Sequence, residues 1–224
     1  MASPPGSRPP LAVKLAFGFG DVTGATISVT YGFFMQAFLL DVAGLNPAAA
    51  GLIFALAQIW DAVTDPAMGR ISDQTRTRWG RRRPFLLFGA VPLAVAFFLH
   101  WLVPPLTSFW LVGYYLVVAL LLRTAFTVVS IPYTALTPDL SPDHDGRTEL
   151  NMYRFVFSIF GSLVAVICHP LLVASAGNIY LGHIFSAGVW ALVIIVSTLV
   201  CFAGTREQPR LMTRPERKLS YGAR

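Results

Sequence analysis

The chain has 224 residues, of which 55% are hydrophobic and 12% are charged, and its mean hydropathy is +0.62. This composition excludes an ordinary water-soluble domain. The formal net charge of +6 is distributed asymmetrically over loops and termini, which argues against nucleic-acid binding, so we expect no nucleic-acid partner. The lipid bilayer is the expected surrounding of most of the chain.

Six apolar segments follow one another along the chain. A hydrocarbon core about 30 Å thick requires roughly 20 residues of α-helix, and each segment reaches about that length. They cover residues 12–40, 48–69, 84–103, 109–136, 150–174 and 181–203. We therefore predict an all-α membrane protein in which residues 12–203 form a bundle of six transmembrane helices. Residues 1–11 are expected to be a disordered cytoplasmic N-terminus, and residues 204–224 are expected to begin a cytoplasmic linker.

Prolines and turn residues set the predicted helix ends. The second helix is expected to end near Pro66 and Gly69. The third is expected to begin at Pro84, because the missing N–H of proline would be unsatisfied in a first turn anyway. Pro132 is expected to bend or end the fourth helix. Residues 137–146 are rich in turn-forming types and predict a loop.

Lys and Arg are distributed unequally between the two ends of the predicted helices. The loops after the first, third and fifth helices, around 41–47, 104–108 and 175–178, contain neither residue type. The opposite loops and both termini carry them, including six arginines between residues 70 and 83. Because positively charged loops stay in the cytoplasm, we expect an integral protein of the plasma (inner) membrane with both termini cytoplasmic.

Five ionisable residues lie inside the predicted spans: Asp21, Asp61, Asp65, Arg123 and Arg154. Counting about 1.5 Å per residue from the predicted helix ends places all of them except Asp65 in one layer, roughly 18 to 22 Å deep, with Asp65 one turn deeper. Charges are costly in lipid, and those that occur there commonly mark an ion or substrate path. The alternative is a set of interhelical ion pairs that only hold the bundle together.

Asp61 and Asp65 are four residues apart and therefore share one face of a helix. Two carboxylates at this spacing repel each other unless a proton or a metal cation lies between them. Thr64 and Thr127 are close to them in predicted depth and offer hydroxyl oxygens. These four residues form the predicted site for a coupling ion, Na⁺ or H⁺. We expect no other metal and no cofactor.

Residues 60–73 (WDAVTDPAMGRISD) and 77–84 (TRWGRRRP) carry a resemblance to a known family. They resemble the glycoside–pentoside–hexuronide:cation symporters, the melibiose permease-like family of the major facilitator superfamily, and the similarity extends over nearly the whole chain after residue 10. This resemblance implies secondary active transport, in which Na⁺ or H⁺ drives the symport of a sugar, a glycoside or a similar small polar solute. It also implies that the chain supplies the N-terminal six-helix half of the fold and that its partner is a C-terminal six-helix half or a second copy.

The resemblance assigns roles to individual residues. Asp61, Asp65 and Thr127 match positions of the family's cation site. Asp21 and Arg154 match charged residues that engage the sugar. A carboxylate and a guanidinium are suited to sugar hydroxyls because both form charge-assisted hydrogen bonds.

Two candidate substrate-binding residues depart from the family's pattern. Ser130 stands where the melibiose permeases have an aspartate that contributes to sugar recognition, and Arg123 replaces a small residue. We keep both as candidate substrate ligands. The loop after the second helix resembles the superfamily's conformational-switch loop, represented here by Gly69, Asp73, Gly80, Arg81 and Arg82.

Two other functions remain open. Asp-x-x-x-Asp in a membrane helix also occurs in lipid or prenyl transferases that hold Mg²⁺ and a diphosphate, but that chemistry needs a second acidic motif. The predicted spans contain no such second motif, so we expect a protein that is not an enzyme. The chain could also be a truncated product without transport activity that acts only in assembly.

Overall fold

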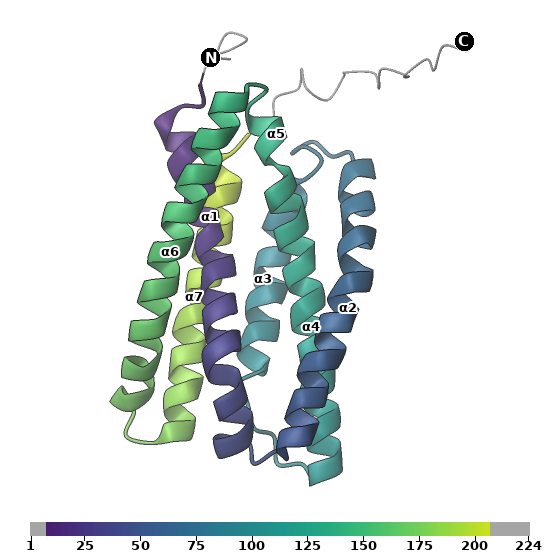
Figure 1. Cartoon of the computed structure of the whole chain (residues 1–224), viewed down its shortest axis with the longest axis vertical. Helices are drawn as coiled ribbons and strands as arrows, with labels where there is room; N and C mark the ends of the chain where they lie inside the picture. The colour runs from purple at the N-terminus through teal and green to yellow at the C-terminus, as the bar shows by residue number, and fades with distance from the viewer. Residues whose placement is uncertain (1–7, 207–224) are drawn as a thin grey trace, which may run out of the picture.

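The computed structural model describes residues 8–206 as a bundle of long helices that run along one axis (Figure 1). The elements in chain order are α1 (Leu11–Val29), the π-helical turns η1 (Thr30–Met35) and η2 (Phe38–Val42), α2 (Pro47–Gln74), α3 (Arg83–Leu99), α4 (Ser108–Ala135), α5 (Thr137–Leu140), α6 (His144–Ser175) and α7 (Ile179–Gly204). Within residues 8–206 no strand forms beyond an isolated bridge between Thr77 and Gly80. The predicted all-α class is confirmed.

Four of the described helices are long and apolar enough to cross a membrane, namely Pro47–Gln74, Ser108–Leu140, His144–Ser175 and Ile179–Gly204. The third predicted span is a shorter apolar helix of 17 residues, α3. The first predicted span is divided between α1 and the π-helical turns that follow it. The total of six membrane spans therefore stays a prediction. The N-terminal and C-terminal stretches expected to be disordered or to form a linker lie largely outside the described residues.

Two features expected at helix boundaries differ in the structure. α2 does not end near Pro66 and Gly69 but continues to Gln74, whereas Pro132 lies three residues before the end of α4 at Ala135. Helices in lipid tolerate proline because neighbouring helices and hydroxyl side chains satisfy the freed backbone groups. Residues 137–146 are not all loop, since they contain α5 and the start of α6. α6 starts there because the Asp143 carboxylate accepts a hydrogen bond from the Gly146 N–H (3.3 Å) and caps its first turn.

At the end of the bundle opposite α5, the connection from η2 to α2 and the connection from α6 to α7 are built in the same way. Gly44 and Gly177 adopt positive φ angles of 70° and 67°, a conformation that glycine allows at little cost. Asn46 then caps α2 by accepting from the N–H of Ala48, and Asn178 caps α7 in the same way. These turns let successive helices reverse direction within a few residues.

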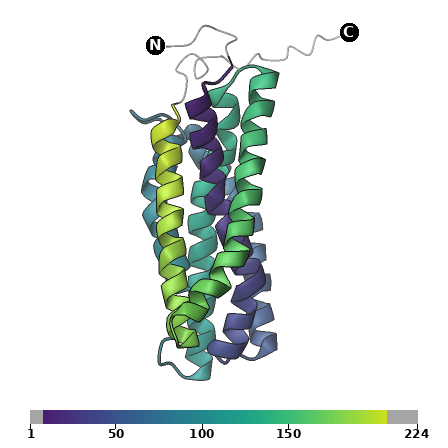
Figure 2. The ribbon, with the colours of Figure 1, turned by 90° about the vertical axis from the view of Figure 1, so that its left-hand side faces the viewer.

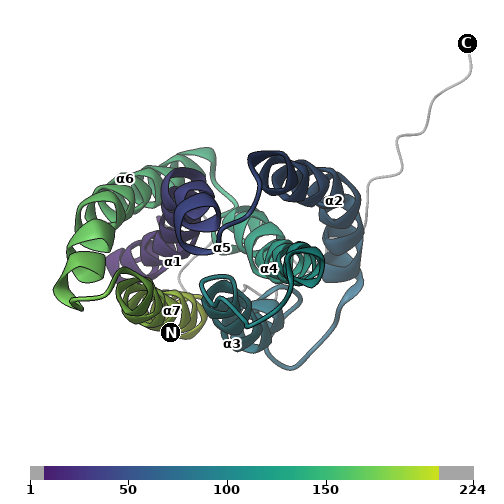
Figure 3. The ribbon, with the colours of Figure 1, turned by 90° about the horizontal axis from the view of Figure 1, so that it is seen from below.

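The helices form two sets of three, seen most clearly along their axes (Figure 3). In the first triplet, α1 lies between α6 and α7, as Figure 2 also shows. In the second triplet, α4 packs against α2 and α3. The two triplets meet mainly where α3 packs on α7. A buried hydrogen bond also joins them, from the Tyr133 hydroxyl of α4 to the Phe17 carbonyl of α1 (2.7 Å).

Polar and steric details fix the first triplet. The Thr23 hydroxyl of α1 lies within hydrogen-bond distance of the hydroxyls of Ser197 (2.6 Å) and Thr198 (3.0 Å) on α7. Gly182 of α7 lies directly against the Val173 carbonyl of α6, so a side chain there would clash with backbone. Small residues at such positions are typical of membrane helices, which associate through close packing and interhelical hydrogen bonds.

Candidate functional site

The predicted acidic pair lies at the interface of α2 and α4, where each carboxylate meets its own partner. Asp61 and Asp65 are one turn apart on α2, and Arg123 and Thr127 are one turn apart on α4. Arg123 Nη1 donates to Asp61 Oδ2 over 2.8 Å, and Thr127 Oγ1 donates to Asp65 Oδ1 over 2.7 Å. The matched i, i+4 spacing on two neighbouring helices produces these two parallel contacts.

These groups are largely removed from solvent. The side chains of Asp61 and Arg123 are 14% and 23% exposed, and Thr127 is 2% exposed. The second oxygen of Asp61, Oδ1, is buried and has no hydrogen-bond partner among the described residues. A buried carboxylate oxygen without a donor is costly, so this atom is available to a ligand that enters the interface.

Thr64 lies beside the acidic pair but its hydroxyl faces its own helix. Its Oγ1 donates to the carbonyl of Trp60 (3.0 Å) and lies 3.5 Å from that of Asp61. The interface also contains a contact that sequence reasoning missed, in which Trp60 Nε1 donates to the Thr124 hydroxyl (2.8 Å). The adjacency of Trp60 to Asp61 in sequence was the only available indication of this contact.

Arg123 also contacts an aromatic ring in η1, the π-helical turn that follows α1. Its guanidinium carbon lies 4.8 Å from the centroid of the Tyr31 ring in η1, a distance typical of a cation–π contact. A cavity of about 220 Å³ adjoins both residues. Its lining residues are Ile27, Ser28, Tyr31, Gly32, Leu122, Arg123 and Phe126. Arg123 therefore lies between the acidic pair and a space large enough for a small polar group.

The second pair of charges inside the predicted spans belongs to α1 and α6. Arg154 Nη2 donates to Asp21 Oδ1 over 3.3 Å, and each side chain is 19% exposed. The Arg154 guanidinium carbon also lies 4.8 Å from the centroid of the Tyr133 ring. Asp21 and Ser130 line a common cavity of about 140 Å³, beside Tyr133. The structure thus groups the candidate substrate residues Asp21, Arg154 and Ser130 around Tyr133.

The single layer of charges predicted from depth is divided into two groups. Asp61, Arg123 and Asp65 lie in the second triplet, whereas Asp21 and Arg154 lie in the first. Among the contacts that the structure describes, no hydrogen bond or ion pair joins the two groups. The estimate of depth along the membrane contained no information on the direction in which each side chain points.

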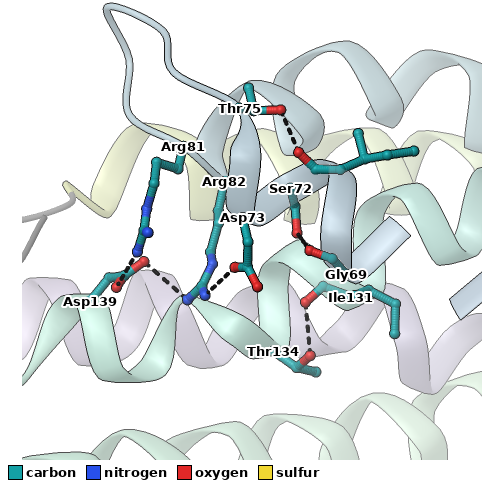
Figure 4. Close-up of polar contacts among 10 residues, drawn as sticks. Gly69, Ser72, Asp73, Thr75, Arg81, Arg82, Ile131, Thr134 and Asp139 are labelled. Carbon is teal, nitrogen blue, oxygen red and sulfur yellow. Dashed lines mark hydrogen bonds and ion pairs between the residues drawn. The ribbon is translucent and has the colours of Figure 1, made fainter. Parts of the chain in front are cut away.

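The conformational-switch candidates form a charged cluster at the α5 end of the bundle (Figure 4). Arg82 donates to Asp73 Oδ1 (2.8 Å) and pairs with Asp139 Oδ2 (3.0 Å), while Arg81 donates to Asp139 Oδ1 (3.3 Å). Gly80 has a φ of 112° and turns the loop that presents both arginines. Sequence reasoning missed Asp139, whose position in a turn-rich acidic stretch was the only indication.

The amino-acid sequence is similar to one protein family and to several known proteins. The sequence model of the family described as MFS/sugar transport protein matches residues 16–222. The uncharacterized symporter sll1374 of Synechocystis is 39% identical over 84% of this chain and 36% of its own length. The inner membrane symporter YicJ of Escherichia coli is 33% identical over 87% of this chain and 43% of its own. The sodium-dependent lysophosphatidylcholine symporter 1-A of Danio rerio is 31% identical over 87% and 42%.

Helices of membrane-crossing length, together with the match to this family model, indicate an integral membrane protein whose sequence is similar to those of transporters. The chain belongs to the MFS/sugar transport protein family. The resemblance to cation symporters is confirmed, because the relatives are named as symporters and one of them as sodium-dependent. The chain spans about two fifths of the length of these relatives.

Proposed function

We propose that the chain forms part of a secondary active transporter in which Na⁺ or H⁺ drives the symport of a sugar, a glycoside or a similar small polar solute. The observation that carries this proposal is the α2–α4 interface, where Asp65 is bonded to Thr127 and Asp61 keeps one buried oxygen without a donor among the described residues. Carboxylate and hydroxyl oxygens inside a membrane suit a coupling ion. The cation site consists of Asp61, Asp65 and Thr127, with Thr64 at its edge.

The proposed substrate site lies where α4 faces α1, apart from the α2–α4 interface. Asp21 and Arg154 supply an acceptor and a donor that can bond sugar hydroxyls, and Ser130 adds a neutral hydroxyl in the adjoining cavity. Arg123 borders the second cavity and can bond a polar group there. Tyr133 is a further candidate because its ring contacts Arg154 and lines the same cavity as Asp21.

The remaining architecture is proposed on the same basis. The chain forms six membrane spans, with α1 and the π-helical turns as the first and α3 as the third, and the α5 end faces the cytoplasm. The cluster of Arg81, Arg82, Asp73 and Asp139 then acts as a conformational switch at that face, together with Gly69 of α2, which lies beside Ile131 of α4, and Gly80, which makes the turn. A C-terminal six-helix half or a second copy completes the transport path, which is consistent with relatives more than twice as long as the matched region.

The two alternative functions make different demands on the same residues. A Mg²⁺-dependent lipid or prenyl transferase needs a second acidic group facing the first. The group that faces Asp61 across the α2–α4 interface is instead the guanidinium of Arg123, which disfavours a Mg²⁺ site there. A product without transport activity is distinguished only by experiment.

The test is uptake by membrane vesicles that hold this chain alone or together with a C-terminal half that completes the relatives' length. A panel of labelled glycosides is supplied with and without a Na⁺ or pH gradient. We expect gradient-driven uptake in at least one of the two preparations, and we expect Asp65→Asn to abolish that uptake. Uptake that ignores both gradients, or turnover of a prenyl or lipid diphosphate that depends on Mg²⁺, contradicts it.

A further inference from the structure

The two acids of the candidate cation site have different partners. Asp61 is held by a cation that belongs to the protein, since Arg123 Nη1 lies 2.8 Å from Asp61 Oδ2. Asp65 is bonded to a neutral hydroxyl, that of Thr127, and no Lys or Arg of the described chain forms an ion pair with it. The acidic pair is therefore already half neutralised before any ion arrives.

A bound monovalent cation and the Arg123 guanidinium cannot both stay close to Asp61 without repulsion. Each would lie within a few ångströms of the same carboxylate, in a region shielded from solvent where like charges interact strongly. An ion that uses Asp61 as a ligand must therefore displace the guanidinium, or it must bind to Asp65 with the guanidinium nearby. In both cases Arg123 lowers the affinity of the site for the ion.

The Arg123 guanidinium already makes a second contact besides the one to Asp61. The Tyr31 ring lies 4.8 Å from its central carbon, and the cavity of about 220 Å³ that both residues border is also lined by Ser28. A guanidinium that leaves Asp61 can remain over the Tyr31 ring and turn toward this cavity. Displacement from Asp61 thus does not leave the positive charge without contacts.

We propose that Arg123 is an internal counter-cation that competes with the coupling ion for Asp61 and thereby sets the ion affinity of the transporter. This inference rests on the proposed function, because it assumes that Asp61 and Asp65 form the ion site. It assigns Arg123 a role other than substrate binding alone. The alternative to competition is a positioning role for Arg123, in which the ion pair holds Asp61 in the geometry that the ion needs.

The two roles predict changes of opposite sign in ion affinity. If Arg123 competes, Arg123→Gln frees Asp61 and tightens Na⁺ binding. If Arg123 only positions Asp61, the same substitution loosens the carboxylate and weakens Na⁺ binding. Tyr31→Leu removes the ring contact that would stabilise the displaced guanidinium, so under competition it weakens Na⁺ binding severalfold.

The experiment is calorimetric titration of the purified full chain in detergent with NaCl at a fixed alkaline pH, with choline chloride keeping the ionic strength constant. We expect Arg123→Gln to lower the Kd for Na⁺ by about tenfold, equivalent to about 1.4 kcal/mol. Arg147→Gln is the matched control, because Arg147 bonds the carbonyls of Asp143 and Pro142 at the end of α6, and it should leave the Kd unchanged. An unchanged or raised Kd in a helical, monodisperse Arg123→Gln protein overturns the proposal.

The titration separates this inference from the function on which it rests. If wild type and Arg123→Gln both bind Na⁺ and Asp65→Asn removes the binding, the site is real and the sign of the Arg123 effect decides the inference. If neither protein binds Na⁺, the proposed Na⁺ site and the inference fall together. If Arg123→Gln does not fold, Tyr31→Leu decides, and unchanged or tighter Na⁺ binding in that variant overturns the inference.

Discussion

The hydroxyl of Thr127 on α4 donates a 2.7 Å hydrogen bond to Oδ1 of Asp65 on α2. This contact fixes one carboxylate oxygen and leaves the remaining lone pairs of Asp65 and of the Thr127 oxygen for a ligand. Because Thr127 is 2% exposed, the bond is protected from water and orders the carboxylate at the helix interface. Asp65 is therefore fixed by a neutral hydroxyl, whereas Asp61 is fixed by the charged guanidinium of Arg123.

Thr127→Val is expected to weaken Na⁺ binding. Valine has nearly the same shape but removes both the donor to Asp65 and an oxygen ligand, which corresponds to about 1 to 2 kcal/mol and a loss of roughly fivefold to thirtyfold in affinity. Na⁺ titration of the purified chain measures the change. Thr148→Val is the control, because the exposed Thr148 hydroxyl bonds the carbonyl of His144 in its own helix. Equal affinities of the two variants would show that Thr127 has no part in the site.

Asp139→Asn is expected to destabilise the end of the bundle at which α5 lies. The substitution removes a negative charge that two guanidinium groups share, and Arg82 and Asp139 are only 11% and 12% exposed. We expect a loss of about 2 kcal/mol in unfolding free energy, measured by denaturation in mixed micelles. Asp145→Asn, at a carboxylate that is 74% exposed, should change it by less than about 0.5 kcal/mol. Similar losses in both variants would mean that the Asp139 cluster adds no stability.

Gly182→Ala is expected to separate α6 from α7. Its new methyl group would meet the backbone carbonyl of Val173, which cannot move aside as a side chain can, so the cost is about 1 to 3 kcal/mol. Gly113→Ala on α4 is the matched change in open space, since no neighbouring atom lies within 4 Å of the place that its methyl group would take. It should be neutral or stabilising by up to about 1 kcal/mol, because alanine favours helix over glycine. Thermal denaturation of both variants tests the contrast, which fails if Gly182→Ala retains wild-type stability.

Thr23→Val and Thr26→Val are expected to have different effects although both residues are buried in α1. The first removes a hydroxyl within 3.0 Å of those of Ser197 and Thr198, at a cost of about 1 kcal/mol. The Thr26 hydroxyl has no hydrogen-bond partner among the described residues, so its replacement by an isosteric apolar group should be neutral or stabilising. Melting temperatures of the two variants provide the measurement. A larger loss for Thr26→Val would contradict these hydrogen-bond assignments.

The helical class was predictable because lipid leaves the backbone few other ways to satisfy its polar groups. Helix ends were less predictable. Pro66 was interpreted by rules for soluble helices, whereas membrane helices continue through proline. The early start of α6 depended on Asp143, which caps the helix. Aspartate is also common in turns, so in this turn-rich stretch the residue did not stand out as a helix cap.

The site was predictable where partners follow helical spacing and unpredictable where they come from distant turns. The spacing of Asp61 and Asp65 and the depth of Thr127 predicted side chains that the structure places together. Asp139 lies 58 residues after Arg81 and outside any predicted span, so no periodicity links them. The ring of Tyr133 was missed because an aromatic residue in an apolar segment has no distinguishing pattern.

Both intramembrane ion pairs lie within a single triplet of helices, Asp61 with Arg123 in one and Asp21 with Arg154 in the other. Two bonds that cross between the triplets end instead on neutral backbone carbonyls, from Tyr133 to Phe17 and from Arg83 to Phe202. A donor that moves along a helix can bond the backbone carbonyl one turn away instead. Opposite charges that are pulled apart in lipid find no such replacement. Sliding of one triplet past the other is therefore the deformation that leaves both intramembrane ion pairs intact.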